Sequence, residues 1–162
     1  MRHLYILVLA VAGCQPSAPG RVQAPADSAA GEVAFQLAGP NDAAIIVPVT
    51  LNGGGPWDFV LDTGATMTCV DQALADSLAL PALRGAVGVG AGVGGGGRLR
   101  LVRFDSVRVG GASATDLPGC TLDLSHVQGI GIRADGLLGL NFLKPFRVTL
   151  DFERSVLILQ EP

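Results

Sequence analysis

Charged and aromatic side chains are scarce in this sequence of 162 residues, at 15% and 5% respectively. Lys and Arg number 11 against 14 Asp and Glu, so there is no basic excess and we expect no nucleic-acid partner. His is limited to two residues, and His126 has no second His near it in the sequence. We interpret it as a surface-loop residue and expect neither a metal site nor another cofactor.

Glycine is abundant instead, with 23 residues, and proline contributes 10 more. Together with apolar runs along most of the chain, this composition favours many turns and hairpins. Once the N-terminus is set aside, the length is enough for one domain and too short for two. We therefore expect a single, ordered all-β domain over residues 32–162.

The first 13 residues have the pattern of an export signal. A positive start precedes an apolar run over residues 4–13, which is too short to span a bilayer as a stable helix. The run ends in Val-Ala-Gly before Cys14, which resembles the bacterial lipobox, where the signal is cut before a cysteine that receives lipid. The resemblance implies that Cys14 is lipidated. An ordinary signal peptide followed by an incidental cysteine is the alternative.

Residues 14–31 are rich in Pro, Ala, Ser and Gly and show no periodicity, which predicts a flexible tether. Gln15 stands where some lipoprotein families carry the aspartate associated with inner-membrane retention. We therefore expect a lipid-anchored protein of the cell envelope. In a cell with two membranes, the anchor would lie in the periplasmic face of the outer membrane.

Short apolar segments separated by turn residues predict a strongly curved or closed β domain with little helix. Asn52-Gly53 predicts a hairpin turn, and Pro48 places its strand near an edge or a bulge. Asp71 is a candidate N-cap for a short helix over residues 71–78, followed by Pro81. Strands are expected at 32–37, 45–51, 57–61, 98–101, 104–109, 146–150 and 156–159.

The apolar strand over residues 57–61 leads directly into Asp62-Thr63-Gly64-Ala65. A carboxylate at the end of a buried strand has a fixed position and can polarise a water molecule, so Asp62 is the candidate catalytic residue. Thr63 offers a hydroxyl that can bond across a partner's loop. Gly64 allows the backbone to approach the carboxylate and donate to it. Ala65 is small enough to leave room for a substrate chain.

A second motif lies downstream, where Leu137-Leu138-Gly139 is followed by Phe142-Leu143. With the Asp62 motif before it, the sequence from about Ile45 to Leu159 resembles the retropepsin-like aspartic proteases, especially bacterial members. In that family the hydrophobic-hydrophobic-glycine loop packs beside the catalytic loop. The resemblance implies a closed β-barrel of the acid-protease type, with one or two short helices and a flap hairpin.

The chain has one Asp-Thr-Gly motif, whereas pepsin-like chains carry two. The resemblance therefore implies a C₂ homodimer in which each subunit supplies one Asp62. Aspartic proteases are a well-known instance of two close carboxyls that share one proton. We expect an aspartic endopeptidase that acts on peptides or proteins through an activated water, without a covalent intermediate, metal or cofactor.

Residues 88–97 are dominated by glycine and formally match a dinucleotide-binding fingerprint. That interpretation fails because such a fingerprint opens a helix, whereas this segment leads into alternating strand residues. The resemblance places the flap here, and Gly88, Gly90, Gly92 and Gly94 suit a mobile lid. A disordered loop is the alternative.

Three further side chains are candidates for a catalytic or structural role. Asp135 could be a second catalytic acid, but a local backbone hydrogen bond of the Asx type before Gly136 is favoured. Cys69 and Cys120 could form a disulfide in an exported protein or remain separate buried thiols, and both possibilities stay open.

The fold does not by itself require catalysis. A catalytically silent lipoprotein could hold an extended peptide by strand addition under the flap. The presence of Asp62, Thr63 and Gly64 together argues for chemistry, because a pure binder has no need for a carboxylate buried against its twin. A structural spacer of the envelope would explain the lipid and the tether but not the motif.

Overall fold

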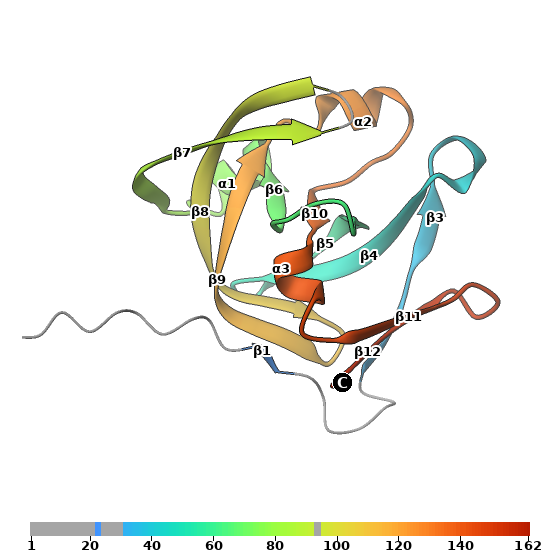
Figure 1. Ribbon diagram of the computed structural model, residues 1–162. Helices are drawn as coiled ribbons and strands as arrows, with labels where there is room; N and C mark the ends of the chain where they lie inside the picture. The colour runs from blue at the N-terminus through green and yellow to red at the C-terminus, as the bar shows by residue number, and fades with distance from the viewer. Residues whose placement is uncertain (1–21, 24–30, 93–94) are drawn as a thin grey trace, which may run out of the picture.

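The computed structural model describes residues 22–23, 31–92 and 95–162. The chain is mostly β, with 53% strand and 16% helix, which confirms the expected all-β class with few short helices. No helix among these residues is long and apolar enough to cross a membrane. The elements, drawn in Figure 1, are β1 (Val22–Gln23), β2 (Glu32–Ala34), β3 (Gln36–Ala38), a 3-10 helix (Pro40–Asp42), β4 (Ala44–Leu51), β5 (Gly54–Leu61), β6 (Cys69–Asp71), α1 (Gln72–Ser77), β7 (Ala82–Gly92), β8 (Gly95–Val109), β9 (Ala112–Leu122), α2 (Ser125–Gly129), β10 (Gly136–Leu138), α3 (Leu140–Leu143), β11 (Arg147–Asp151) and β12 (Val156–Gln160).

The larger sheet closes on itself. Its strand order is β1-β9-β6-β10-β5-β4-β8-β7, with β3 on β4, and β9 pairs with β8 as well as with β6. Strands β9, β6, β10, β5, β4 and β8 therefore form a ring, and the expected closed barrel is confirmed. A second sheet, in the order β11-β12-β2, joins the two ends of the described domain (Figure 1).

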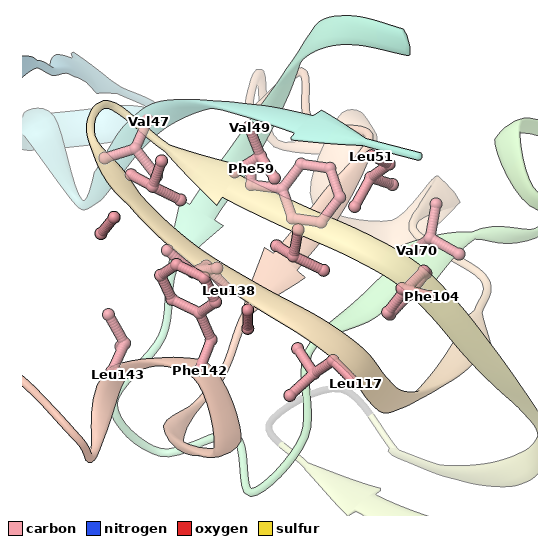
Figure 2. Packing of buried hydrophobic residues seen from close by; sticks show 14 of the residues in the cluster. Val47, Val49, Leu51, Phe59, Val70, Phe104, Leu117, Leu138, Phe142 and Leu143 are labelled. Atoms are coloured by element: carbon pink, nitrogen blue, oxygen red, sulfur yellow. The ribbon is translucent and has the colours of Figure 1, made fainter. Parts of the chain in front are cut away.

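The main core fills the inside of the barrel (Figure 2). Side chains alternate along β5, so that Phe59 is fully buried in this core while Val60 faces the other side and is half-buried. Removing such large apolar side chains from water is the main stabilising contribution of the fold. The largest fully buried side chains are Phe59, Phe104, Phe142, Leu51, Leu138, Leu143, Leu157 and Leu159.

Local signals in the sequence predict the hairpin that precedes Asp62. Asn52 and Gly53 have φ angles of 49° and 81°, the left-handed values that a tight hairpin turn between β4 and β5 requires. Asn52 also accepts a hydrogen bond from Ser106 N through its side chain, which ties the turn to β8. Pro48 lies inside β4 rather than on an edge strand, but the register shifts nearby, between Val49 and Leu51.

Helix α1 begins where its capping residue predicts. Asp71 accepts a hydrogen bond from Ala73 N at 2.9 Å, so it is the N-cap, and the helix runs from Gln72 to Ser77. The chain leaves the helix through Ala79, whose φ is 49°, before Pro81 is reached.

Part of the expected N-terminal organisation lies outside the described residues. This applies to the signal peptide over residues 1–13, to Cys14 and to most of the tether. Within the predicted tether, Val22 and Gln23 form a short strand that pairs with Ala114 and Ser113 of β9.

Candidate active site

Asp62 stands at the end of β5, in the middle of the barrel wall. Its backbone N–H donates to Leu138 O at 3.1 Å, so the parallel pairing of β5 with β10 continues into Asp62. Strand β10 also pairs antiparallel with β6, into which the loop over residues 62–68 leads. The chain therefore enters this loop on one side of β10 and leaves it on the other. This arrangement fixes both ends of the loop.

The carboxylate of Asp62 is half-buried and is oriented by its own loop. Its Oδ1 accepts hydrogen bonds from Gly64 N at 2.8 Å and from Ala65 N at 3.2 Å. A Cβ on residue 64 would lie 3.2 Å from this same oxygen, so glycine gives the carboxylate the most room. No hydrogen bond among the described residues engages Oδ2. One oxygen is thus held in place while the other is free to act on a ligand.

The remaining residues of the motif lie around this carboxylate. Thr63 and Gly64 are exposed, and Ala65 is half-buried. The carbonyl of Ala65 accepts a hydrogen bond from Leu140 N at 2.8 Å, which ties the loop to the start of α3. The exposed Thr63 hydroxyl is placed where a second molecule could reach it.

The Leu137-Leu138-Gly139 segment lies directly beside the catalytic loop. Leu138 is fully buried in the main core, and Leu137 pairs in register with Val60 of β5. At Gly139 a Cβ would lie 2.4 Å from the carbonyl carbon and oxygen of Met67, which leaves no space for any other residue. This close approach brings the two motifs of the sequence into one site.

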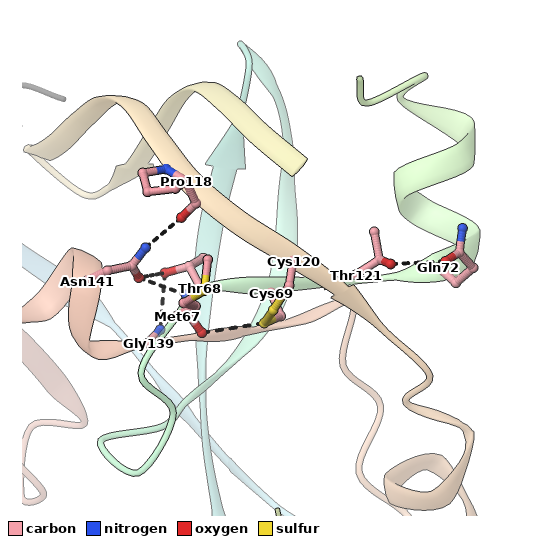
Figure 3. Close-up of a disulfide and its surroundings, with 9 residues drawn as sticks. All are labelled: Met67, Thr68, Cys69, Gln72, Pro118, Cys120, Thr121, Gly139 and Asn141. Carbon is pink, nitrogen blue, oxygen red and sulfur yellow. Dashed lines mark hydrogen bonds between the residues drawn. A yellow bond between two sulfur atoms is a disulfide. The ribbon is translucent and has the colours of Figure 1, made fainter. Parts of the chain in front are cut away.

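A hydrogen-bond network that the sequence analysis did not predict joins three segments behind the loop (Figure 3). Thr68 is fully buried, and its amide and hydroxyl donate to Asn141 Oδ1 at 2.7 and 2.9 Å. The same hydroxyl accepts from Gly139 N at 3.2 Å, while Asn141 Nδ2 donates to Pro118 O at 2.7 Å. The available signal was one polar residue, Asn141, inside the apolar stretch 137–143.

Residues 82–92 and 95–109 form an antiparallel hairpin, β7 and β8, at the position expected for the flap. Gly88 pairs with Leu99, Gly90 with Gly97, and Gly92 with Gly95. The segment thus leads into a strand. A dinucleotide-binding fingerprint would require a helix at this point. Gly94, the fourth predicted flap residue, lies outside the described residues.

Asp135 immediately precedes β10 and lies beside Asp58, in the middle of β5. Its Oδ2 accepts a hydrogen bond from Asp58 N at 2.9 Å, and its own N–H donates to Asp58 O. The expected hydrogen bond between the Asp135 side chain and backbone is therefore present, but its donor lies 77 residues away and not in an adjoining Asx-type turn. A surface hollow of about 440 Å³ adjoins this contact, lined by Asp58, Gln128, Arg133, Ala134 and Asp135.

Cys69 and Cys120 form a disulfide, which settles the alternative that the sequence left open (Figure 3). The two residues face each other in the parallel pair β6 and β9, with Cα atoms 4.5 Å apart.

His126 lies in the short helix α2 and not in a loop. Among the described residues, no group of His, Cys, Asp and Glu side chains could hold a metal ion.

A polar cluster connects α1 with the barrel strands beside the disulfide. Asp76 accepts hydrogen bonds from Gln72 Nε2 at 2.8 Å and from Arg100 Nη2 at 3.0 Å. These two contacts hold the pKa of the Asp76 carboxyl below its ordinary value of 3.8, with Gln72 as the larger cause. Thr121 completes the cluster by donating to Gln72 Oε1 at 3.1 Å.

Comparisons with known proteins found one family model and similar solved structures. The solved structure of a retropepsin-like aspartic protease from Rickettsia conorii is similar, with a TM-score of 0.53 and 21% identity over 86% of this chain and 92% of that one. The retroviral protease-like domain of Ddi1 from Leishmania major gives a TM-score of 0.44 and 18% identity over 74% of this chain and 94% of that one. No curated protein matches the sequence significantly. The family model described as aspartyl protease matches residues 47–142, more than half of the chain, and includes both motifs. The chain therefore belongs to the aspartyl protease family and has a retropepsin-like fold.

Proposed function

We propose that this chain is one subunit of a homodimeric aspartic endopeptidase, with the reacting water held between two Asp62 carboxyls. The observation that carries the proposal is the hydrogen bonding of the Asp62 carboxylate. Its Oδ1 is oriented by the amides of Gly64 and Ala65, and its Oδ2 has no partner among the described residues. A carboxylate held in this way at the end of a central strand is prepared to take a proton from water.

A second copy is needed because the described part of one subunit offers no second carboxyl beside Asp62. Asp58 and Asp135 are bonded to each other in the middle of β5, where Asp135 Oδ2 accepts from Asp58 N and Asp135 N donates to Asp58 O. At about 3.3 Å per residue, Asp58 lies about 13 Å along β5 from Asp62. Two surface features beside the catalytic loop favour a partner, the exposed hydroxyl residue Thr63 and Leu140, which is 38% exposed.

In such a dimer the two carboxyls are too close for both to ionise, so they hold one proton between them. The ionised Asp62 takes a proton from water as the water oxygen attacks the peptide carbonyl. The protonated Asp62 donates to the carbonyl oxygen, and a proton then passes to the leaving nitrogen as the C–N bond breaks. The flap hairpin of β7 and β8 would cover the extended substrate during these steps.

The same proposal includes the cellular place of the protein. Lipid on Cys14 would anchor the domain to the cell envelope, on the periplasmic face of the outer membrane in a cell with two membranes. The Cys69–Cys120 disulfide supports an exported protein, since disulfides persist mainly in oxidising compartments. Metabolic labelling with an alkyne fatty acid tests the anchor. Incorporation into the full chain and its loss in Cys14→Ser are expected, and labelling of both proteins would contradict the assignment.

A peptide-binding lipoprotein without catalysis is the second candidate. It is favoured by one observation, the glycine-rich strand β7, which pairs only with β8 among the described strands and so leaves one edge free for an added strand. Such a protein would bind extended peptides equally well with or without the carboxyl of Asp62.

The deciding experiment uses the chain from Gln15 onward, produced with its disulfide oxidised. Its oligomeric state is measured by analytical ultracentrifugation, and cleavage of a diverse peptide mixture is mapped by mass spectrometry across pH. Asp62→Asn keeps the shape of the side chain and removes its titrating group. Cleavage by the parent alone would establish the endopeptidase. No cleavage by a folded, dimeric parent would favour the peptide-binding protein.

A further inference from the structure

The disulfide lies between the catalytic loop and the flap strand. Cys69 is the first residue of β6 and so directly follows the loop over residues 62–68 that carries Asp62. Cys120 pairs in register with Cys69 on one side and with Leu101 of β8 on the other. Strand β8 begins in the flap hairpin and continues through Leu101 into the barrel wall. The disulfide therefore lies between the loop over residues 62–68, which leads into β6, and strand β8, which pairs with β9.

Few other bonds join the loop over residues 62–68 and strand β6 to strand β9. Strand β6 is only three residues long, and its parallel pairing with β9 ends at Asp71 and Leu122. Short parallel pairing is the weaker kind of strand contact. On the backbone side, Cys120 N donates to Thr68 O at 3.2 Å, which makes Thr68 the residue through which the loop meets β9.

Beside the bridge, the Arg100–Asp76 ion pair is exposed and weak in comparison, while the Thr121–Gln72 hydrogen bond is partly buried. Arg100 and Thr121 pair in register on β8 and β9, and both reach toward α1. Arg100 bonds to Asp76, whose side chain is 60% exposed, and exposed ion pairs of this kind contribute little. By contrast, Cys69 and Cys120 are 6% and 1% exposed, so the bridge is a covalent link inside the protein.

We propose that the Cys69–Cys120 disulfide positions the catalytic loop against the flap strand, and that proteolysis depends on it. The inference rests on the proposed peptidase function for its consequence in catalysis, but not for the mechanical coupling itself. With the bridge closed, Asp62 and the base of the flap move as one unit. With the bridge open, the loop is held by β10, by the Cys120 N–Thr68 O hydrogen bond and by the Thr68–Asn141 network.

The opening reaction is ordinary thiol–disulfide exchange. A dithiol reductant attacks one sulfur, the S–S bond breaks, and the dithiol becomes a cyclic disulfide as both cysteines gain a hydrogen. The proposal therefore predicts an activity that is lost on reduction. A variant without the two sulfur atoms must show no further response to the same reductant.

The test compares the oxidised chain with Cys69→Ala/Cys120→Val, in which small apolar side chains fill the same space. Amide hydrogen exchange is followed by mass spectrometry with fragmentation, under conditions where both proteins are folded. The amides of Gly64 and Ala65, which bond to Asp62, report on the catalytic loop, and those of Leu99 to Val102 report on the base of the flap. Strand β12, in the other sheet, is the internal control.

We expect exchange to rise about tenfold or more at the loop and at the base of the flap, with β12 unchanged. In parallel, kcat/KM for a cleaved peptide should fall by a similar factor. Once a mass measurement shows that dithiothreitol has opened the buried bridge, the activity of the parent should fall and that of the variant should not. An unchanged loop would overturn the proposal. A uniform rise that included β12 would also overturn it, because the bridge would then act only on global stability. If the parent cleaves nothing, the exchange data still decide the coupling, and only the peptidase function fails.

Discussion

Asn141 accepts two hydrogen bonds from Thr68 through a single oxygen, one from the Thr68 amide at 2.7 Å and one from its hydroxyl at 2.9 Å. The two residues are 73 positions apart in the sequence, and Thr68 is fully buried. The contact therefore fixes the exit of the catalytic loop to the segment that follows Leu137-Leu138-Gly139. A buried network of this kind is stabilising only while all of its members are paired.

Replacing Asn141 by Ala should destabilise the fold by about 2–4 kcal/mol, since the buried amide and hydroxyl of Thr68 would lose their acceptor. The measurement is the free energy of unfolding from urea titration followed by circular dichroism. Thr68→Ser is the matched control, because it keeps both donors and removes only a methyl group. A loss in the control as large as in Asn141→Ala would show that packing, and not hydrogen bonding, determines the effect.

Asp62→Asn should lower peptide cleavage by about 10³-fold or more while leaving the unfolding free energy nearly unchanged. The amide cannot ionise, so it cannot take a proton from water. Asp135→Asn is the matched control, since an asparagine oxygen can still accept the hydrogen bond from Asp58 N, and its activity should stay near that of the parent. Initial rates on one cleaved peptide check both variants, and a strong loss in Asp135→Asn would give that carboxyl a direct part in the reaction.

Mixed dimers provide a separate test of the shared site. When the parent is mixed with an equal amount of Asp62→Asn and the subunits are allowed to exchange, only dimers with two intact carboxyls should cleave. Activity per parent chain should then fall to about one half. Activity that stayed constant during exchange would mean that each subunit works alone.

Gly139→Ala should destabilise the protein by about 1–3 kcal/mol or prevent folding, because its Cβ would overlap the backbone of Met67 at 2.4 Å. The clashing atoms belong to the backbone of Met67, which cannot move away as a flexible side chain can. Gly129→Ala in α2 is the control, since nothing lies within 4 Å of a Cβ there. Thermal unfolding of the two variants should differ clearly, and equal melting temperatures would contradict the close approach.

The contact of Asp76 with Gln72 and Arg100 should make a small part of the stability depend on pH. These partners lower the pKa of Asp76 in the folded protein below its ordinary value of 3.8. The stabilisation is therefore complete above that value and is lost as the pH falls through the lower folded pKa. Asp76→Asn should accordingly be less stable than the parent in urea at pH 6, and the difference should shrink near pH 2. A difference that grew on acidification would contradict this sign.

Local signals in the sequence were enough for the elements around Asp62. Asn52 and Gly53 predicted the hairpin because their backbone preferences are local, and Asp71 predicted the start of α1 for the same reason. The order of the two motifs, recognised through a family resemblance, predicted that Leu137–Gly139 would accompany Asp62.

The disulfide and the contact of Asp135 depend on how distant strands align, and no short stretch of sequence determines that register. Whether Cys69 meets Cys120 is determined by how β6 and β9 align, and the alignment of β10 with β5 decides which backbone group Asp135 reaches. A slip of one residue would turn both side chains to the opposite face. The short strand at Val22–Gln23 was missed because two residues carry no periodicity.

The buried bridge between Cys69 and Cys120 also bears on when the protein would become dangerous to its own cell. A chain still in a reducing interior would keep two thiols there, and its catalytic loop would not yet be fastened to the flap. Under the proposed function and localisation, hydrolysis would begin only after export, away from newly made cytoplasmic proteins. For the proposed peptidase, the bridge would then act as a form of latency, because an oxidising compartment would close it.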